Sequence, residues 1–182
     1  MIKLSVLFSV KTFPQESDDY YDDANPNIAG LAEWFINIPD LFLLLLGKDA
    51  VATPFAAYTE PGTNKALVVE TTKAQQRWQA FFVIAKHAAP QLAEELAHIN
   101  NLLMAEQYPY LVLDIWSTVT EKEQAKKVYK AYVDDLISKA SRLEDALSIC
   151  VPSNVSAPFA EIIVVSQNHF GYWSTAVVAD SD

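Results

Sequence analysis

The sequence predicts a single α+β domain with about four helices and a mixed or antiparallel sheet of about four to five short strands. Stretches in which apolar and polar residues alternate, as in strands, are interspersed with stretches of helical periodicity. The 182 residues are 51% hydrophobic, which is enough to build one core and excludes general disorder. No repeat, low-complexity linker or composition break divides residues 1–182 into separate domains.

The N-terminal third is predicted to begin with a strand. In residues 2–10, IKLSVLFSV, the apolar residues Ile2, Leu4, Val6, Phe8 and Val10 alternate along the chain, which favours a half-buried strand over a signal peptide. Residues 14–27, PQESDDYYDDANPN, form the acidic loop of the predicted domain, because they contain two prolines and almost no core-forming residues. A short helical piece is expected at 28–35.

Residues 39–46, PDLFLLLL, predict a short helix that is buried on most sides. Pro39 suits the first turn of a helix, and Asp40 is favourable near the positive end of the helix dipole. Gly47 is well placed to end the helix. The apolar run is far too short to span a bilayer.

The central region predicts a turn at 60–64, where Gly62 can adopt positive φ, followed by a strand at 65–70. Thr72 and Gln75 have the spacing of a capping box that opens a helix. Similar patterns predict an amphipathic helix from Pro90, a strand at 110–116, and a long helix from a capping box at Thr120 and Glu123 to residue 148. The C-terminal stretches 159–166 and 172–179 predict a β-hairpin or a pair of neighbouring strands.

The charge is strongly acidic and unevenly distributed. Thirteen Lys and Arg residues against 23 Asp and Glu residues give a net charge of −10. Residues 1–60 contain three of the basic and nine of the acidic residues. Such a charge disfavours nucleic acid and anionic membrane surfaces as partners, and it attracts a basic protein. The lone cysteine, Cys150, excludes an internal disulfide and suits a reducing cytoplasm, so we expect a soluble cytoplasmic protein.

Motifs for metal binding are incomplete. Asp23, Asn25 and Asn27 match the first positions of a calcium-binding EF-hand loop, but Ile28 and Trp34 occupy the positions that require glycine and glutamate. Glu95 and His98 provide half of a di-iron motif, and the other two histidines lack the matching glutamate. His98 is more simply explained as a surface pair with Glu94. We therefore expect no metal and no cofactor.

Motifs for catalysis are also missing. Cys150 and His169 could form a nucleophile and base, but no signature of a cysteine or serine hydrolase surrounds them, and a small buried hydrophobe is the simpler reading of Cys150. With four glycines, the chain has no phosphate-cradling loop and no dinucleotide fingerprint. The sequence thus favours a non-enzymatic protein, with an enzyme of unrecognised type as the least favoured alternative.

The acidic loop is the favoured binding site. Tyr20 and Tyr21 lie between two aspartate pairs, and tyrosine is common at interfaces because it offers apolar area with a polar end. The carboxylates can form charge-assisted hydrogen bonds with Lys or Arg of a partner. The predicted partner-binding residues are Asp18, Asp19, Tyr20, Tyr21, Asp22 and Asp23. The alternative is a solvent-exposed connecting segment without a binding role, which is what most runs of charged residues are.

Residues 30–47, GLAEWFINIPDLFLLLLG, resemble a segment of small bacterial immunity proteins that accompany polymorphic or contact-dependent toxins. The matching residues are Gly30, Glu33, Trp34, Ile38, Pro39 and Gly47. The resemblance implies a cytoplasmic immunity protein that binds and neutralises one basic cognate toxin domain, which could be a nuclease. It transfers no binding residue. The alternative is a small regulatory or ligand-binding domain with a pocket near residues 169–173, where Trp173 either packs in the core or forms a contact patch.

Overall fold

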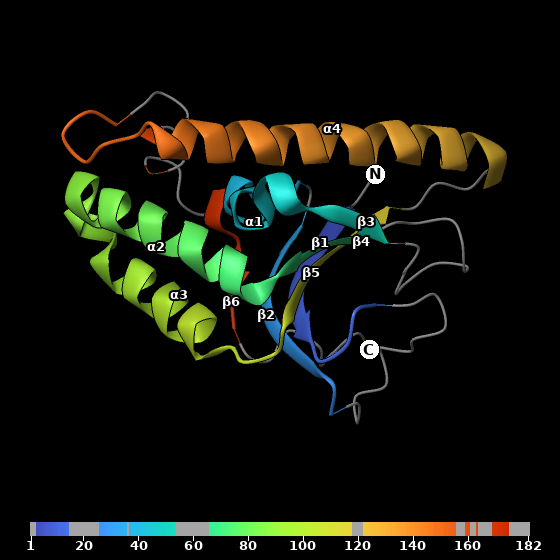
Figure 1. Ribbon diagram of the computed structural model, residues 1–182, viewed down its shortest axis with the longest axis horizontal. Helices are drawn as coiled ribbons and strands as arrows, with labels where there is room; N and C mark the ends of the chain where they lie inside the picture. Colours follow the sequence, from blue (N-terminus) through green and yellow to red (C-terminus); the bar gives the residue numbers. More distant parts are fainter. Residues whose placement is uncertain are drawn as a thin grey trace.

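The computed structural model describes residues 3–14, 26–35, 37–53, 66–117, 122–155, 159–160, 163 and 169–174. Within these ranges it contains four α-helices and a six-stranded sheet, which confirms the predicted α+β class (Figure 1). All the strand pairs are antiparallel, in the spatial order β3-β4-β5-β1-β2-β6. The strands are β1 (Lys3–Val10), β2 (Ile28–Phe35), β3 (Val51–Thr53), β4 (Ala66–Glu70), β5 (Tyr110–Ser117) and β6 (Tyr172–Trp173).

The four helices are α1 (Asp40–Leu46), α2 (Thr71–Ala88), α3 (Ala93–Ala105) and α4 (Lys122–Ser148). Short 3₁₀ turns follow α1 (η1, Gly47–Asp49) and precede α3 (η2, Pro90–Leu92). Figure 1 shows α2 and α3 running side by side, and α4 extending across the molecule past α1. The long helix ends at residue 148, as the apolar periodicity predicts.

The sheet presents two apolar faces, because successive side chains of a strand point to opposite sides. On one face, residues such as Leu7, Leu67 and Leu113 join the main core beneath the helices. On the other face, Val6 and Phe8 belong to a smaller buried cluster. All eight residues of β1 pair with β5 on one side, and Leu4–Val10 pair with β2 on the other, so this strand is the centre of the sheet.

Helix α1 is the most deeply buried helix that the structure describes. All six of its residues from Leu41 to Leu46 are at most 1% exposed, because α1 is packed against α2, α4 and the sheet. This burial on every side explains why the sequence shows a continuous apolar run instead of a helical stripe. Gly47 ends the helix at φ +58°, in a region of backbone conformation that favours glycine.

Two local predictions were wrong. Residues 28–35 form strand β2 and not a helical piece, because tertiary pairing with β1 and β6 decides the conformation of a short apolar stretch. The capping box of Thr72 and Gln75 does not form, since α2 begins at Thr71 and its N-cap has no side-chain hydrogen bond. Gln75 instead donates to the carbonyl oxygens of Leu103 and Glu106 at the end of α3, at 3.0 and 3.1 Å.

The C-terminal region completes one edge of the sheet. Strand β6 forms where the second arm of the predicted hairpin begins, and it pairs with β2. In the range of the predicted first arm, Phe159, Ala160 and Ile163 have helical backbone. The predicted turn at 60–64 and the second capping box at Thr120 lie outside the described residues.

Candidate functional site

The predicted partner-binding residues Asp18, Asp19, Tyr20, Tyr21, Asp22 and Asp23 all lie outside the described residues. The charge of the described part can nevertheless be compared with that of the rest of the chain. The described residues contain 12 Lys and Arg against 13 Asp and Glu, out of totals of 13 and 23. The excess of negative charge therefore belongs to the remaining segments. Residues 15–25 alone contribute five acidic residues and no basic residue.

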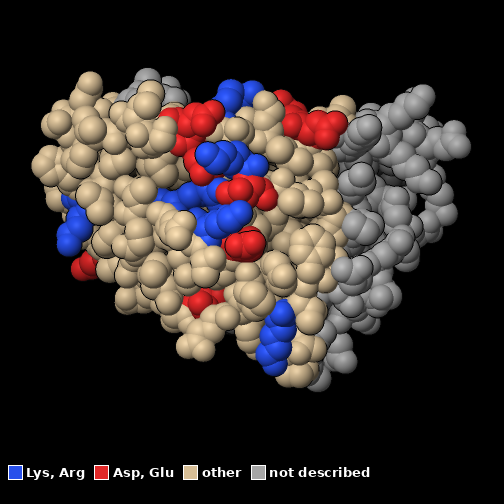
Figure 2. All heavy atoms as spheres, in the orientation of Figure 1, with Lys and Arg blue, Asp and Glu red and all other residues tan. Residues whose placement is uncertain are grey.

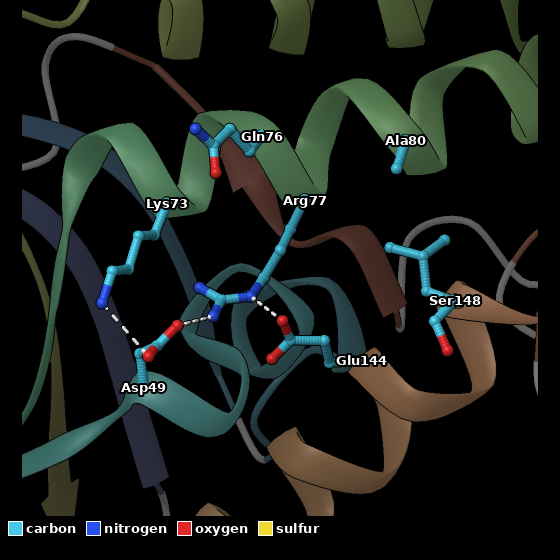
Figure 3. A pocket seen from close by; sticks show the side chains of 8 residues that line it. Asp49, Lys73, Gln76, Arg77, Ala80, Glu144 and Ser148 are labelled. Carbon is cyan, nitrogen blue, oxygen red and sulfur yellow. Dashed lines mark hydrogen bonds and ion pairs between the residues drawn. The ribbon is translucent and has the colours of Figure 1, made fainter.

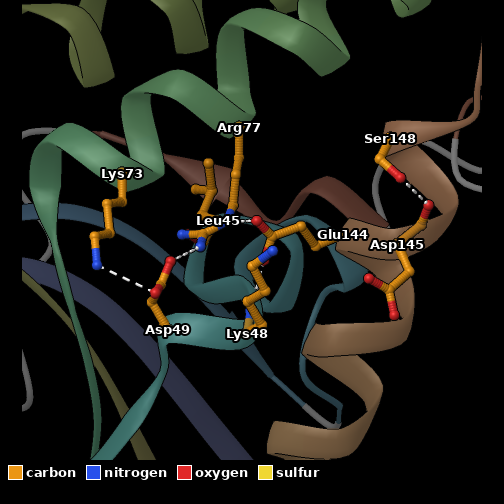
Figure 4. A network of polar contacts seen from close by, with 8 residues as sticks. All are labelled: Leu45, Lys48, Asp49, Lys73, Arg77, Glu144, Asp145 and Ser148. Carbon is orange, nitrogen blue, oxygen red and sulfur yellow. Dashed lines mark hydrogen bonds and ion pairs between the residues drawn. The ribbon is translucent and has the colours of Figure 1, made fainter.

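The acidic and basic side chains of the described body lie close together. Figure 2 shows red and blue side chains intermixed near the middle of one face, with no large field of one sign there. The best-connected group joins η1, α2 and α4, and it consists of Asp49, Lys73, Arg77 and Glu144 (Figure 4). We call these four side chains the Arg77 cluster. Its formal charges add to zero.

Arg77 is the centre of this cluster. Its side chain is only 6% exposed and projects from the same helix face as buried apolar residues. A charged side chain is tolerated there because two carboxylates pair with it. Its Nη2 donates to Asp49, and its Nη1 donates to the carbonyl oxygen of Leu45 at 3.2 Å. Its Nε lies 3.1 Å from Glu144 Oε1, but the N–H is not aligned for a hydrogen bond, so this contact is a charge interaction.

The carboxylates of the cluster have second partners. Lys73 Nζ donates to Asp49 at 3.1 Å, and the backbone N–H of Lys48 donates to Glu144 Oε2 at 2.7 Å. The hydrogen bond from Lys73, together with the charge of Arg77, holds the pKa of Asp49 below its usual value, although burial acts in the opposite direction. Asp49 is consequently ionised at neutral pH.

Gly47 explains how the backbone can pass beneath these charges. A Cβ atom at this position would collide with the guanidinium of Arg77 and with the carboxylate of Glu144. The turn after α1 therefore requires glycine twice, for its positive φ and for the close approach of the cluster. The role of Gly47 as a helix end was predicted from the sequence, but its contact with Arg77 was not.

A hollow of about 440 Å³ lies beside the cluster, between α2 and the C-terminal end of α4 (Figure 3). A second hollow of about 550 Å³ shares Asp49 and Lys73 with the first. The first is lined by the four cluster residues with Gln76, Ala80, Leu147 and Ser148. The hydroxyl of Ser148 donates to the carbonyl oxygen of Asp145, so it is engaged within its own helix.

The chemistry of this hollow suits structure or binding better than acid–base catalysis. A general acid or base works best with a pKa near the working pH, whereas the pKa of Asp49 is shifted down and away from neutrality. Sequence reasoning missed this cluster because its members are distant in the chain. The only available signal was a charged residue, Arg77, on the apolar face of α2.

The region of the alternative prediction, residues 169–173, is largely part of the core. Trp173 is 5% exposed and makes an edge-on contact with Phe42, and Phe170 is fully buried. His169 Nδ1 lies 3.5 Å from Asp40 Oδ2, and the other oxygen of this carboxylate, Oδ1, accepts a hydrogen bond from Lys139. Core packing of Trp173, one of the two predicted roles, is thus confirmed. Tyr172 is the exception, since it is 63% exposed.

His98 has a different partner from the one predicted. Its Nε2 donates to the carbonyl oxygen of Trp173 at 2.9 Å, which ties α3 to β6. Cys150 is half-buried and packs against the main core. Across the described ranges, no group of three or more His, Cys, Asp and Glu side chains is arranged to hold a metal ion. Among the helices that these ranges contain, none is long and apolar enough to cross a membrane.

Comparison with known proteins gives a family but no activity. Neither a curated protein nor a solved structure matches the chain. Residues 13–153 match the family described as Domain of unknown function (DUF7822). The match begins just after β1, includes the acidic loop and all four helices, and ends just after α4. Because it covers well over half of the sequence, the chain belongs to the DUF7822 family.

Proposed function

We propose that this protein is a non-enzymatic binding protein that neutralises a basic protein partner, as an immunity protein does with its cognate toxin domain. The contacts are made by the acidic loop, with Asp18, Asp19, Asp22 and Asp23 as the charged groups and Tyr20 and Tyr21 as anchors. The site of action is the cytoplasm, where such a toxin domain would do its damage.

The distribution of charge is the observation that supports this proposal. In the described body, charges are nearly balanced, and acidic groups such as Asp49 and Glu144 are already paired with Arg77. A basic partner would gain little from acids that are neutralised within the fold. Residues 15–25 contain five acidic residues and no lysine or arginine, so their negative charge is not compensated within the segment. Such a concentration of charge steers a cationic protein toward its binding site.

The proposal is tested with the protein encoded by the reading frame next to the gene for this chain, which is the candidate toxin. The candidate toxin, expressed in cells, should arrest growth, and co-expression of this chain should restore growth. With the purified pair, replacing the four aspartates with asparagine should lower the association rate by about tenfold or more at low salt and flatten its salt dependence.

A matched control removes the same amount of charge elsewhere. Replacing Glu94, Glu106, Asp134 and Asp145, which lie in or beside the helices, with the corresponding amides should change the association rate much less. If the product of the neighbouring reading frame does not arrest growth, or if this chain does not restore growth, the proposed neutralising function is contradicted. Restored growth with equal rates for the two quadruple variants would contradict the loop as the binding site.

A second candidate function is the binding of a small ligand, and the hollow beside Arg77 favours it. Its volume of about 440 Å³ is within the range of ligand sites, and Gln76 with the four charged groups provides polar contacts. One measurement distinguishes small-ligand binding from neutralisation of a protein partner. A small molecule that remains with the protein in native mass spectrometry, and is lost from an Arg77→Met variant that is still folded, would favour the ligand.

A further inference from the structure

Three side chains form an exposed patch at the β6 edge of the sheet. Glu33 of β2 is directly opposite Tyr172 of β6 in the antiparallel register, and opposite residues point to the same face. Phe35 follows Glu33 by two positions along β2, so it also points to that face. An acidic side chain therefore has one aromatic neighbour across the strands and another along its own strand.

Both aromatic side chains are open to solvent. Tyr172 is 63% exposed and Phe35 is 52% exposed, which is unusual for such large apolar groups. Among the described strands, Val51 of β3 is another exposed apolar residue, but the residue opposite it is Val68 of β4 and not an acid. The combination of two aromatic groups with a carboxylate distinguishes this patch from the scattered apolar residues of an ordinary surface.

Glu33 is half-buried and lacks a cation within the described ranges. No ion pair or hydrogen bond joins its carboxylate to another described side chain, in contrast to Asp40, Asp49 and Glu144. Burial accordingly raises the pKa of Glu33 above its ordinary value. Binding a cation is more favourable in free energy for a carboxylate that is partly dehydrated and has no partner than for a fully hydrated carboxylate.

We propose that Glu33, Phe35 and Tyr172 form a contact site for an arginine side chain of a basic protein partner. The guanidinium donates to the Glu33 carboxylate in a charge-assisted pair, and its flat face lies against an aromatic ring. Arginine fits better than lysine, because its planar group can stack on a ring while its N–H groups remain directed at an acid. The net charge of −10 provides the long-range attraction for such a partner.

This inference rests on the proposed function for the identity of the partner, but it can be tested without that partner. The probe is a blocked peptide with three arginines separated by glycines, and the reference peptide has citrulline, which is neutral, in place of arginine. Backbone amide shifts of the complete protein are followed by NMR during the titration. We expect the largest changes at residues 33–35 and 172–173 with the arginine peptide, and none of that size with the citrulline peptide.

Variants locate the site and separate it from general attraction to an acidic protein. Glu33→Gln should weaken binding of the arginine peptide by about threefold or more, and Glu94→Gln on exposed α3 should change it by less than about twofold. Tyr172→Ser and Phe35→Ser should each weaken binding, and folding of each variant is checked by its circular dichroism spectrum. Equal losses for Glu33→Gln and Glu94→Gln, or shifts that concentrate elsewhere, would overturn the proposal.

The outcomes also distinguish this inference from the proposed function. If the peptide binds at Glu33 but the neighbouring gene product is not neutralised, the patch stands and the immunity function fails. If neutralisation depends on the aspartates at 18, 19, 22 and 23 but the peptide does not bind at Glu33, the function stands and the patch fails.

Discussion

Replacing Arg77 with methionine is the most direct test of the packing around α1. Methionine keeps an unbranched apolar stem but lacks the guanidinium group, so the change removes the charge and the hydrogen bonds of Arg77. Arg77 is 6% exposed and contacts two carboxylates and the carbonyl oxygen of Leu45. The substitution would thus leave both Asp49 and Glu144 without their shared cation.

The expected loss in the free energy of unfolding depends on which interactions Asp49 and Glu144 keep when Arg77 is replaced. Removing one member of a buried ion pair costs roughly 3–5 kcal/mol when the remaining charge is isolated. Here Asp49 is 34% exposed and keeps Lys73, and Glu144 is 19% exposed and keeps the N–H of Lys48. These remaining partners and the access of water reduce the cost. We expect the free energy of unfolding to fall by about 2–3 kcal/mol.

Urea denaturation at pH 7 measures this loss, and a double-mutant cycle with Glu144→Gln isolates the pair. The two changes together should cost about 1 kcal/mol less than the sum of the single changes, because the second no longer breaks an ion pair. Arg142→Met is the control, since Arg142 is exposed on α4 and should lose less than about 0.5 kcal/mol. An Arg77→Met variant as stable as Arg142→Met, or a cycle with no coupling, would refute the reasoning.

Two further predictions concern single backbone and charge features. Gly47→Ala should lower the free energy of unfolding by about 3 kcal/mol or more in urea, because alanine is strained at φ +58° and its Cβ displaces Arg77; a loss below about 1 kcal/mol would contradict the close approach. Glu33→Gln should stabilise the protein slightly at pH 7, because a raised folded pKa means that ionisation of Glu33 opposes folding, and the partial exposure of Glu33 to water keeps this effect small. This gain should disappear as the pH falls below the unfolded pKa of Glu33, and a gain that is the same at pH 3 and pH 7 would show that its charge is not the cause.

Elements with a strong local signal were predictable from the sequence. Strand β1 follows from the alternation of most of its apolar residues, and α1 follows from Pro39, the apolar run and Gly47. The long helix α4 follows from a sustained period, which extends over seven turns and fixes its end at residue 148. In each case, local preference and tertiary packing favour the same conformation, so the residues alone are sufficient.

Elements that depend on distant partners were not predictable. Strand β2 has too little regular alternation to distinguish it from a helix, and its register with β1 shifts between the pairs Leu7–Ala32 and Phe8–Gly30. Strand β3 is three residues long and exists through pairing with β4. The second edge, β6, pairs with β2 more than 130 positions away in the sequence. Periodicity within a window contains no information about such pairings.

The same distinction applies to the candidate sites. The acidic loop is a local feature, so its composition alone could suggest a binding surface. The Arg77 cluster and the Glu33 patch each unite residues that are distant in sequence, and neither can be found before the register of the sheet and the packing of the helices are known. Glu33 was noticed in the sequence only for its place in the resemblance, and Tyr172 only as part of an aromatic cluster.

The loop and the patch would contribute to one association in different ways. The concentrated charge of residues 15–25 would act at long range, because an electrostatic field extends over roughly 8–10 Å at physiological salt, and it would therefore raise the rate of encounter. A half-buried carboxylate between aromatic side chains acts only on contact, and its loss should show in the dissociation rate. Charge removal in the loop should consequently change association, whereas Glu33→Gln should change dissociation with little effect on the salt dependence. If one surface bound the partner and the other were incidental, both rates would respond to the same set of variants.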